Sequence, residues 1–248
     1  MSTNEMTAVR SSETMGGLLV GIVDRPAATL WAVVDRPGAW TWLAPLLILV
    51  ICLVPMVVVQ APYNVEIARQ QVRLQMDQMP AEQQQQAAGQ MEMFTSAPFL
   101  IATGLGMGVI MLLIGLAAQA LVLYLGSLAA GGEVTFGLMF RVSTWSRLPY
   151  AASYLALTGF TLLAGRAVRY PGLSALVATG SLLQDSQKPL FTLLSGIDLF
   201  WLWHLALVAI GVSAARRSRN GAAIVMALVY AILSLAVSAL PTLLFRGS

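Results

Sequence analysis

The chain has 248 residues, of which 58% are hydrophobic and only 10% are charged. A soluble domain of this length carries roughly a quarter charged residues, so most of this surface is not expected to face water. The net charge of +3 comes from scattered basic residues, without the basic stripe and interleaved aromatic residues of a nucleic-acid-binding protein. Composition therefore indicates an integral membrane protein with lipids, and no nucleic acid, among its partners.

Residues 1–38 are predicted to form a cytoplasmic N-terminal region that contains one interfacial helix. A short repeat, Val-Asp-Arg-Pro, occurs at residues 23–26 and again at 34–37. Proline after a polar residue is a start signal for a helix, so the repeat brackets a short amphipathic segment. We expect this segment to lie on the membrane surface before the first span.

Residues 39–245 are predicted to form an all-α membrane domain, a polytopic bundle of five transmembrane helices with interfacial amphipathic helices. About 20 apolar residues cross the ~30 Å hydrocarbon core of a bilayer. Trp40 and Trp42 stand at the start of the first such stretch, as residues of an interfacial aromatic belt would. The five spans are expected at residues 40–59, 98–125, 149–165, 197–215 and 221–240.

Two connections help to define the spans. No turn signal divides the second interval near its middle, so we predict one long helix there, followed by a loop at Gly131 and Gly132. A tight polar turn at residues 216–220 joins the last two spans and holds the only basic cluster in a short loop. Basic loops stay in the cytoplasm, which places the N-terminus inside and the C-terminus outside.

Residues 60–97 are predicted to form an extracytoplasmic helical insert rich in Gln and Met. Arg69 lies three residues after Glu66, and Arg73 lies four residues before Asp77, so each pair has helical spacing for an ion pair. Pro80 is expected to break the helix, after which it can resume.

A second amphipathic helix is predicted at residues 133–148, directly before Pro149 opens the third span. Phe136, Met139, Phe140 and Trp145 would form its apolar side. Long arginine side chains keep their charge at the membrane surface, and we expect Arg141 and Arg147 to do so here.

Polar groups inside spans are candidates for function because a charge in hydrocarbon is costly. Asp198 follows Ser195 with capping-box spacing, so a helix cap is favoured over an ion or proton site. His204 is the only histidine and lies six residues after Asp198, about 120° around the helix. A hydrogen bond between helices is therefore favoured for His204 over a metal site or proton relay, and the same role is expected for Gln119.

Small residues recur along one face of two spans. In the second span Gly104, Gly108 and Gly115 fall near one face with Gln119, and in the fifth span the corresponding residues are Ala227, Ala231, Ser234 and Ser238. Small residues let helices approach closely. Packing inside the bundle is the favoured explanation, and a separate homo-oligomer interface is the alternative.

No motif for catalysis stands out. The sequence has no His-Glu-x-x-His motif, no phosphate-binding loop and no paired carboxylates within a span, and its single cysteine is Cys52. We therefore predict that the chain is not an enzyme and uses no cofactor or metal.

Four short motifs occur in order along the chain. They are Asp35-Arg36-Pro37, the run from Gly131 to Phe136, Pro149-Tyr150, and the run from Ile197 to Trp203. Together they resemble the Yip domain family of five-span membrane proteins, in a bacterial form, from about residue 26 to the C-terminus. The resemblance implies a non-catalytic binding or scaffolding subunit, and some bacterial members look like accessory partners of export-type ABC transporters.

The leading hypothesis is thus an accessory or scaffold subunit of the bacterial inner membrane that binds another integral membrane protein, such as an ABC exporter. The insert at residues 60–97 is the expected docking surface. The alternatives are a small transporter that uses Asp198, His204 and Gln119, and a membrane-shaping protein that uses its amphipathic helices. The candidate functional residues are Asp198, His204, Gln119, Trp203, Arg147, Pro149, Arg69 and Arg73.

Overall fold

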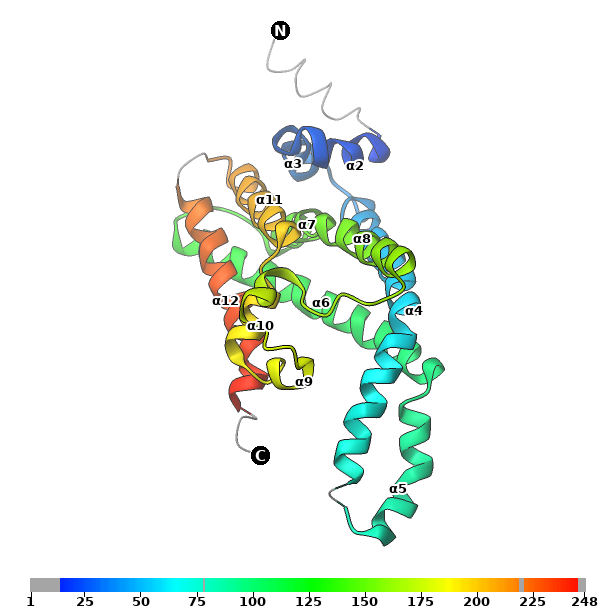
Figure 1. The fold of residues 1–248 in the computed structure, drawn as a ribbon. Coiled ribbons are helices and arrows are strands. Elements are labelled where there is room, and N and C mark those ends of the chain that lie inside the picture. Colours follow the sequence, from blue (N-terminus) through cyan, green and yellow to red (C-terminus); the bar gives the residue numbers. More distant parts are fainter. Residues whose placement is uncertain (1–13, 78, 219–220, 245–248) are drawn as a thin grey trace, which may run out of the picture. The chain divides into compact units, whose positions relative to one another are not determined.

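The computed structural model describes residues 14–77, 79–218 and 221–244, and every regular element among them is a helix (Figure 1). The elements are α2 (Met15–Asp24), α3 (Pro26–Asp35), α4 (Trp40–Met76), α5 (Ala81–Phe94), α6 (Ala97–Ala129), α7 (Phe136–Ser146), α8 (Leu148–Ala164), the 3₁₀ helix η1 (Gly172–Val177), α9 (Leu182–Asp185), α10 (Pro189–Ser195), α11 (Leu199–Ala215) and α12 (Ala222–Leu244). The all-α prediction is confirmed for the described residues.

The chain divides into two compact units. Unit 1 contains the described residues of 1–49, 114–151 and 169–248, and unit 2 contains residues 50–113 and 152–168. Helices α4, α6 and α8 each contribute to both units.

Three helices are long and apolar enough to cross a membrane, namely α4, α6 and α12. Helices α10 and α11 meet at a bend of 66° and add a fourth if the pair forms one broken span. The predicted third span, α8, has only 17 residues, about 26 Å, which is less than the hydrocarbon thickness. Five spans therefore remain a prediction.

Large apolar side chains cover the outward faces of the spanning helices. Ile51 of α4, Ile114 of α6 and Ile232 of α12 are 66%, 57% and 67% exposed. Extensive exposed apolar surface is rare on monomeric soluble proteins and marks an interaction with a membrane or another protein. Lipid is the solvent that this surface fits.

Helix α4 continues without interruption from the predicted first span into the predicted insert. Its 37 residues give it a length of about 55 Å. The predicted break at Pro80 is confirmed, because Pro80 is the N-cap of α5. Within the described residues Glu66 accepts a hydrogen bond from Gln70 at 3.0 Å and forms no ion pair with Arg69, so the predicted pairing is wrong.

Two glycines of α6 fit against α4 in unit 2. A Cβ atom at Gly104 would meet Val57 at 3.1 Å, and one at Gly108 would meet Leu53 at 3.0 Å. The close-approach motif of the second span therefore packs inside the bundle, as predicted.

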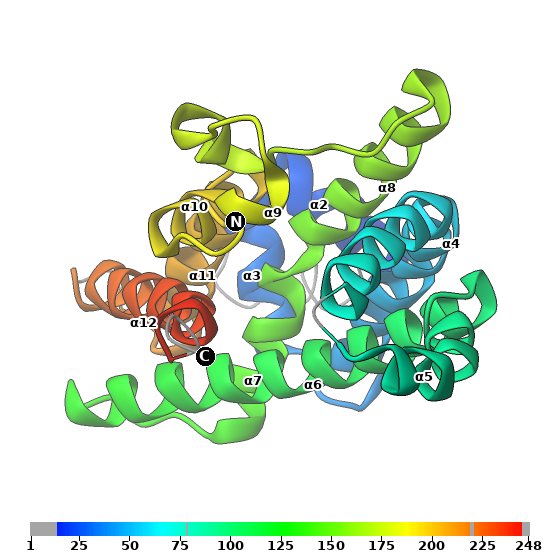
Figure 2. The same ribbon diagram turned by 60° about the horizontal axis from the view of Figure 1, so that its bottom comes forward.

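The N-terminal segment forms two helices, because the chain breaks at Arg25 and Pro26 begins α3. The prediction of one surface helix is wrong for α3. Its Leu30 and Val33 are fully buried, and it packs against α7 and α11 (Figure 2). Val20 of α2 remains 67% exposed, so a surface position for α2 stays a prediction.

Helix α7 lies in the core of unit 1, so its predicted place on the membrane surface is wrong. Met139 and Trp145 are fully buried, and the Trp145 indole donates to the Thr41 carbonyl at 2.5 Å. Arg141 is half-buried and turns toward α3. Its Nη1 donates to the carbonyls of Val33, Val34 and Arg36, where α3 ends and backbone donors run short.

A tight turn follows α11, as predicted. Arg217 has a left-handed φ of 50° and donates to Asp35 at 2.6 Å, while Arg216 donates to the Ala130 carbonyl at 3.0 Å. Arg219 and Asn220, as well as Arg10 and Arg246, lie outside the described residues. The orientation in the membrane remains a prediction.

Helices α7 and α11 touch at Gly211, where a Cβ atom would lie 2.5 Å from Cγ1 of Val142. Gly211→Ala should lower the free energy of unfolding by about 1–3 kcal/mol through overpacking. Gly137→Ala on α7 is the matched control, because no atom lies within 4 Å of a Cβ there, and alanine favours a helix over glycine. Thermal unfolding in detergent, monitored by circular dichroism, measures the stability of both variants. Equal effects of the two substitutions would contradict the close packing at Gly211.

Candidate functional site

A closed ring of polar residues joins four helices in the core of unit 1. Arg147, which caps the end of α7, donates from Nε to Oε1 of Gln119 on α6 at 3.1 Å and from Nη2 to the Tyr230 hydroxyl on α12 at 3.3 Å. Gln119 donates to the Ser146 hydroxyl at 3.0 Å. His204 on α11 closes the ring, with Nδ1 2.7 Å from the Ser146 carbonyl and Nε2 3.4 Å from the Tyr230 hydroxyl.

The acceptors in the ring assign its hydrogens. A carbonyl oxygen only accepts, so Nδ1 of His204 carries the hydrogen that binds Ser146. In the neutral imidazole Nε2 is then an acceptor, and the Tyr230 hydroxyl donates to it. The same hydroxyl oxygen accepts from Arg147. The orientation of each side chain in the ring is therefore fixed by hydrogen bonds to its two neighbours.

The break between α7 and α8 places Arg147 in the ring. Helix α7 ends at Ser146, and α8 begins at Leu148 with Pro149 as its second residue. Proline has no N–H to continue the preceding helix and is favoured in a first turn. Arg147 therefore occupies a corner, from which its side chain extends toward α6 and α12.

Gly115 makes room for the guanidinium. A Cβ atom at this position would lie 3.0 Å from Nη2 and 3.1 Å from Nη1 of Arg147. A larger residue at position 115 would press against the guanidinium and force it to shift by a few tenths of an ångström. The ring of Tyr150, 6.0 Å from Cζ of Arg147, adds a weak cation–π contact.

The ring is largely buried around a half-buried Arg147, whose positive charge has no carboxylate partner in the described residues. Gln119, Ser146 and His204 are fully buried, and Tyr230 is 8% exposed. The described ion pairs join Asp24 to Arg25, Asp185 to Lys188 and Asp35 to Arg217. Arg147 is thus held by neutral groups alone.

The ring also lies deep in the spanning helices. Gly115 is close to the centre of the charge-free residues 93–132, which contain α6. Tyr230 is close to the centre of residues 220–245, which contain α12. The guanidinium therefore lies beside the middle of two long charge-free segments, and an ionisable residue among membrane spans marks a functional site by default.

Of the eight predicted site residues, the structure brings together Gln119, Arg147 and His204, with Pro149 beside them. The predicted role of His204 and Gln119 in joining helices is confirmed. Arg147 was expected at the membrane surface, but it is half-buried and its Nε and Nη2 donate to Gln119 and Tyr230 inside the bundle.

The other four lie elsewhere. The Asp198 carboxylate caps α11 by accepting from the Trp201 amide at 2.7 Å, which confirms the cap. The capping box is wrong, since Ser195 donates to the Thr192 carbonyl. Trp203 packs against a buried apolar cluster of α2, α3 and α7, whereas Arg69 and Arg73 are exposed on α4.

Sequence reasoning missed Ser146 and Tyr230. Tyrosine in a span is typical of the interfaces, so Tyr230 near the centre of a charge-free run was a usable signal. The sequence around Ser146 gave no such signal. Its hydroxyl and its carbonyl join the ring through Gln119 and His204, which are distant in the chain.

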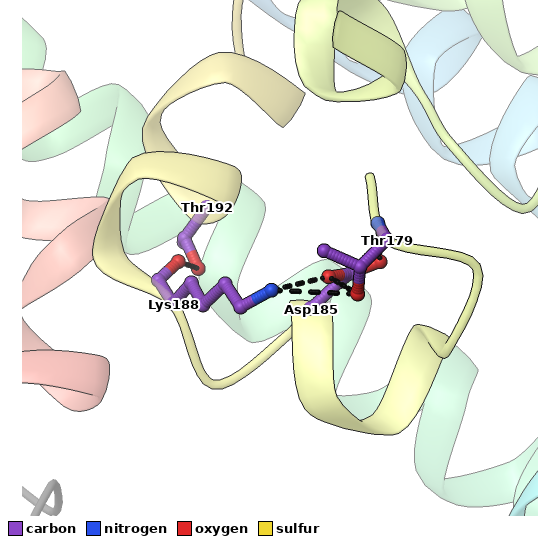
Figure 3. Close-up of polar contacts among 4 residues, drawn as sticks. All are labelled: Thr179, Asp185, Lys188 and Thr192. Carbon is purple, nitrogen blue, oxygen red and sulfur yellow. Dashed lines mark hydrogen bonds and ion pairs between the residues drawn. The ribbon is translucent and has the colours of Figure 1, made fainter. Parts of the chain in front are cut away.

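A second polar cluster lies outside the spanning helices, between η1 and α10 (Figure 3). The buried Asp185 carboxylate accepts from the Lys188 ammonium at 2.8 Å, and from the hydroxyl and amide of Thr179 at 2.7 and 2.8 Å. The hydrogen bonds from Lys188, then those from Thr179, lower the pKa of Asp185 to about 2. The three hydrogen bonds to this carboxylate fix the loop that leads to α10.

No group of three or more His, Cys, Asp or Glu side chains able to hold a metal ion occurs within the described residues. The polar groups of the ring instead hydrogen-bond to one another, an arrangement that suits binding and the positioning of helices.

The helices and the ring together define a multi-pass helical membrane protein with a charged polar centre in its bundle. The Yip1 domain matches residues 20–240, and the chain belongs to the Yip1 domain family. No curated protein and no solved structure matches the chain.

Tyr230→Phe should lower the free energy of unfolding by about 1–2 kcal/mol, because Arg147 and His204 each lose a partner in the bundle. Tyr124→Phe on α6 is the control, since the Tyr124 hydroxyl makes no hydrogen bond within the described residues and its ring contact with Phe136 would survive. Thermal unfolding in detergent reports both. A Tyr230→Phe protein as stable as the Tyr124→Phe protein would contradict the ring.

The Asp185 cluster should loosen in acid. A pKa of about 2, below the ordinary 3.8, means that the carboxylate stabilises the fold above pH 4 and loses this contribution as the pH falls from about 4 through 2. Hydrogen exchange at the Thr179 amide, corrected for intrinsic rates, should show this loss of protection. In Asp185→Asn protection should already be weaker at pH 5 and independent of acid, and an unchanged acid response there would assign the effect to another group.

Proposed function

We propose that this chain is a non-catalytic accessory or scaffold subunit of the bacterial inner membrane that binds another integral membrane protein, such as an ABC-type exporter. Its proposed docking element is the helical hairpin formed by the C-terminal part of α4 and by α5. The observation that carries the proposal is the length and exposed surface of this hairpin. The Yip1 domain family is not an enzyme family, which supports a non-catalytic role.

The hairpin is too long and too charged to remain in hydrocarbon. The apolar residues 40–59 account for about 30 Å of α4. The remaining 17 residues up to Met76 continue for about 25 Å and carry Glu66, Arg69 and Arg73. A charged helix stays in water, so this half of α4 projects beyond the membrane.

The hairpin exposes apolar side chains where water would surround it. Leu74 and Met93 are each 55% exposed, and Phe94 is 46% exposed. Flexible methionines and exposed aromatic rings are typical of protein-binding surfaces. Figure 1 shows α5 returning alongside the end of α4. Gln84 holds the turn by donating to the Met76 and Met79 carbonyls at 3.0 and 2.9 Å.

The two other hypotheses draw less support. A transporter would use Asp198 with His204 and Gln119, but the Asp198 carboxylate is engaged as a helix cap away from the polar ring. A membrane-shaping protein would need amphipathic helices on the surface, whereas α3 and α7 pack in the core of unit 1. Scaffolding requires neither feature.

Photo-crosslinking in intact membranes tests the proposal. A photoreactive residue at Leu74 or Met93 should crosslink to one and the same integral membrane protein, and the full chain should copurify with it in mild detergent. A photoreactive residue at Leu163, 92% exposed on the lipid-facing α8, is the control and should label lipid.

Leu74→Gln should reduce the copurified partner tenfold or more, because burying a leucine in an interface contributes about 1.5–3 kcal/mol. Gln75→Ala, a neighbouring exposed position, should leave it unchanged. Different proteins at the two hairpin positions, or no copurification, would refute the proposal.

A further inference from the structure

An apolar groove of about 390 Å³ lies in unit 1 between the C-terminal part of α6 and the N-terminal part of α12. Its lining includes Gly126 and Ala129 of α6, Ala130 directly after that helix, and Ala222 of α12. Small residues of this kind let the backbone of another helix approach closely within a membrane. The lining therefore fits one face of a transmembrane helix.

The groove ends near the polar ring. Val122, in its wall, lies three residues from Gln119, and Met226, in the opposite wall, lies four residues from Tyr230. Residues three or four apart share a helix face, about one turn or ~5.4 Å apart. Gln119 and Tyr230 are the two side chains that hold Arg147. The side chains that hold the positive charge of Arg147 thus continue the two helix faces that line the groove, about one turn further along each helix.

Arg147 retains donors for a ligand. Of its five N–H groups, one is used by Gln119 and one by Tyr230, and Nη1 donates to no described residue. Nη1 is also absent from the fully buried side-chain atoms without a partner, unlike Nε of Arg141 and Nε of Arg216. The free part of the guanidinium is therefore accessible, and its planar fork matches a carboxylate.

We propose that Arg147 binds the carboxylate of an Asp or Glu side chain on a transmembrane helix of the partner, and that this helix lies in the groove between α6 and α12. The inference rests on the proposed function and names the chemistry of the partner inside the membrane. Charge complementarity sets the register of the partner helix, because an unpaired arginine near the centre of hydrocarbon is costly.

The observations favour a different protein over a second copy of this chain or a lipid. None of the eleven acidic residues lies within α6, α8, α11 or α12, or in the apolar part of α4, so a second copy offers no carboxylate at this depth. Phospholipid phosphates lie at the surface, about 15 Å from the centre of the bilayer. The apolar lining gives a soluble carboxylate no second polar partner.

The test uses the full chain in phosphatidylcholine vesicles and a synthetic leucine–alanine helix of about 20 residues, flanked by lysines and carrying one central Glu. The matched peptide carries Gln instead, so the protein itself is unchanged between the two measurements. Fluorescence energy transfer between labelled peptide and chain measures binding. The Glu peptide should bind about tenfold more tightly, a difference within the range of polar contacts between membrane helices.

Two variants locate the effect. Arg147→Gln should remove the preference for Glu, while the control Arg166→Gln, in the loop after α8, should keep it. Gly126→Leu, which fills the groove, should weaken binding of both peptides. Circular dichroism and thermal unfolding establish that each variant is folded.

Three outcomes would overturn the inference. They are equal binding of the two peptides by the unchanged chain, a preference that survives in Arg147→Gln, and loss of the preference on adding millimolar acetate together with direct acetate binding at Arg147, which would indicate a small-anion site. If any of these occurs while the hairpin crosslinks persist, this inference fails and the proposed function stands.

Discussion

The structure of unit 1 depends on holding one guanidinium among membrane helices. A charge removed from water must be bound on several sides, and neutral donors and acceptors do so only when their geometry is fixed. Gln119, Ser146, His204 and Tyr230 supply that geometry from four helices. A shift of any helix along its axis would leave a buried polar group unpaired, so the ring specifies the register of the bundle as well as its stability.

Features that depend on neighbours in the chain could be predicted from the sequence, and features that depend on distant partners could not. Apolar length identified α4, α6 and α12, and local turn chemistry identified the break at Pro80 and the cap at Asp198, because both depend on neighbours in the chain. The position of α7 could not be predicted this way. An arginine in an amphipathic pattern suggests a surface helix, but Arg141 finds its partners in the carbonyls that end α3, more than a hundred residues earlier.

The candidate site shows the same division. Gln119, Arg147 and His204 were each recognisable as polar residues in or beside apolar segments, yet nothing local indicates that they meet. Their convergence depends on the corner at Pro149 and on the space at Gly115, which become meaningful only when α6 and α7 are packed. The cluster at Asp185 was missed for a related reason, since its partners are a threonine and a lysine of ordinary loop composition.

Two contacts at different depths would serve a scaffold better than one. Hydrophobic association gives little discrimination between membrane helices, because lipid is as apolar as the helices themselves. A charge pair inside the membrane supplies discrimination through the penalty for a wrong partner, while an exposed hairpin outside can add affinity through ordinary apolar burial. Once the charge pair or the hairpin contact has formed, the second contact forms within the same complex, so its effective concentration is high. Modest individual contacts would then suffice for a selective complex.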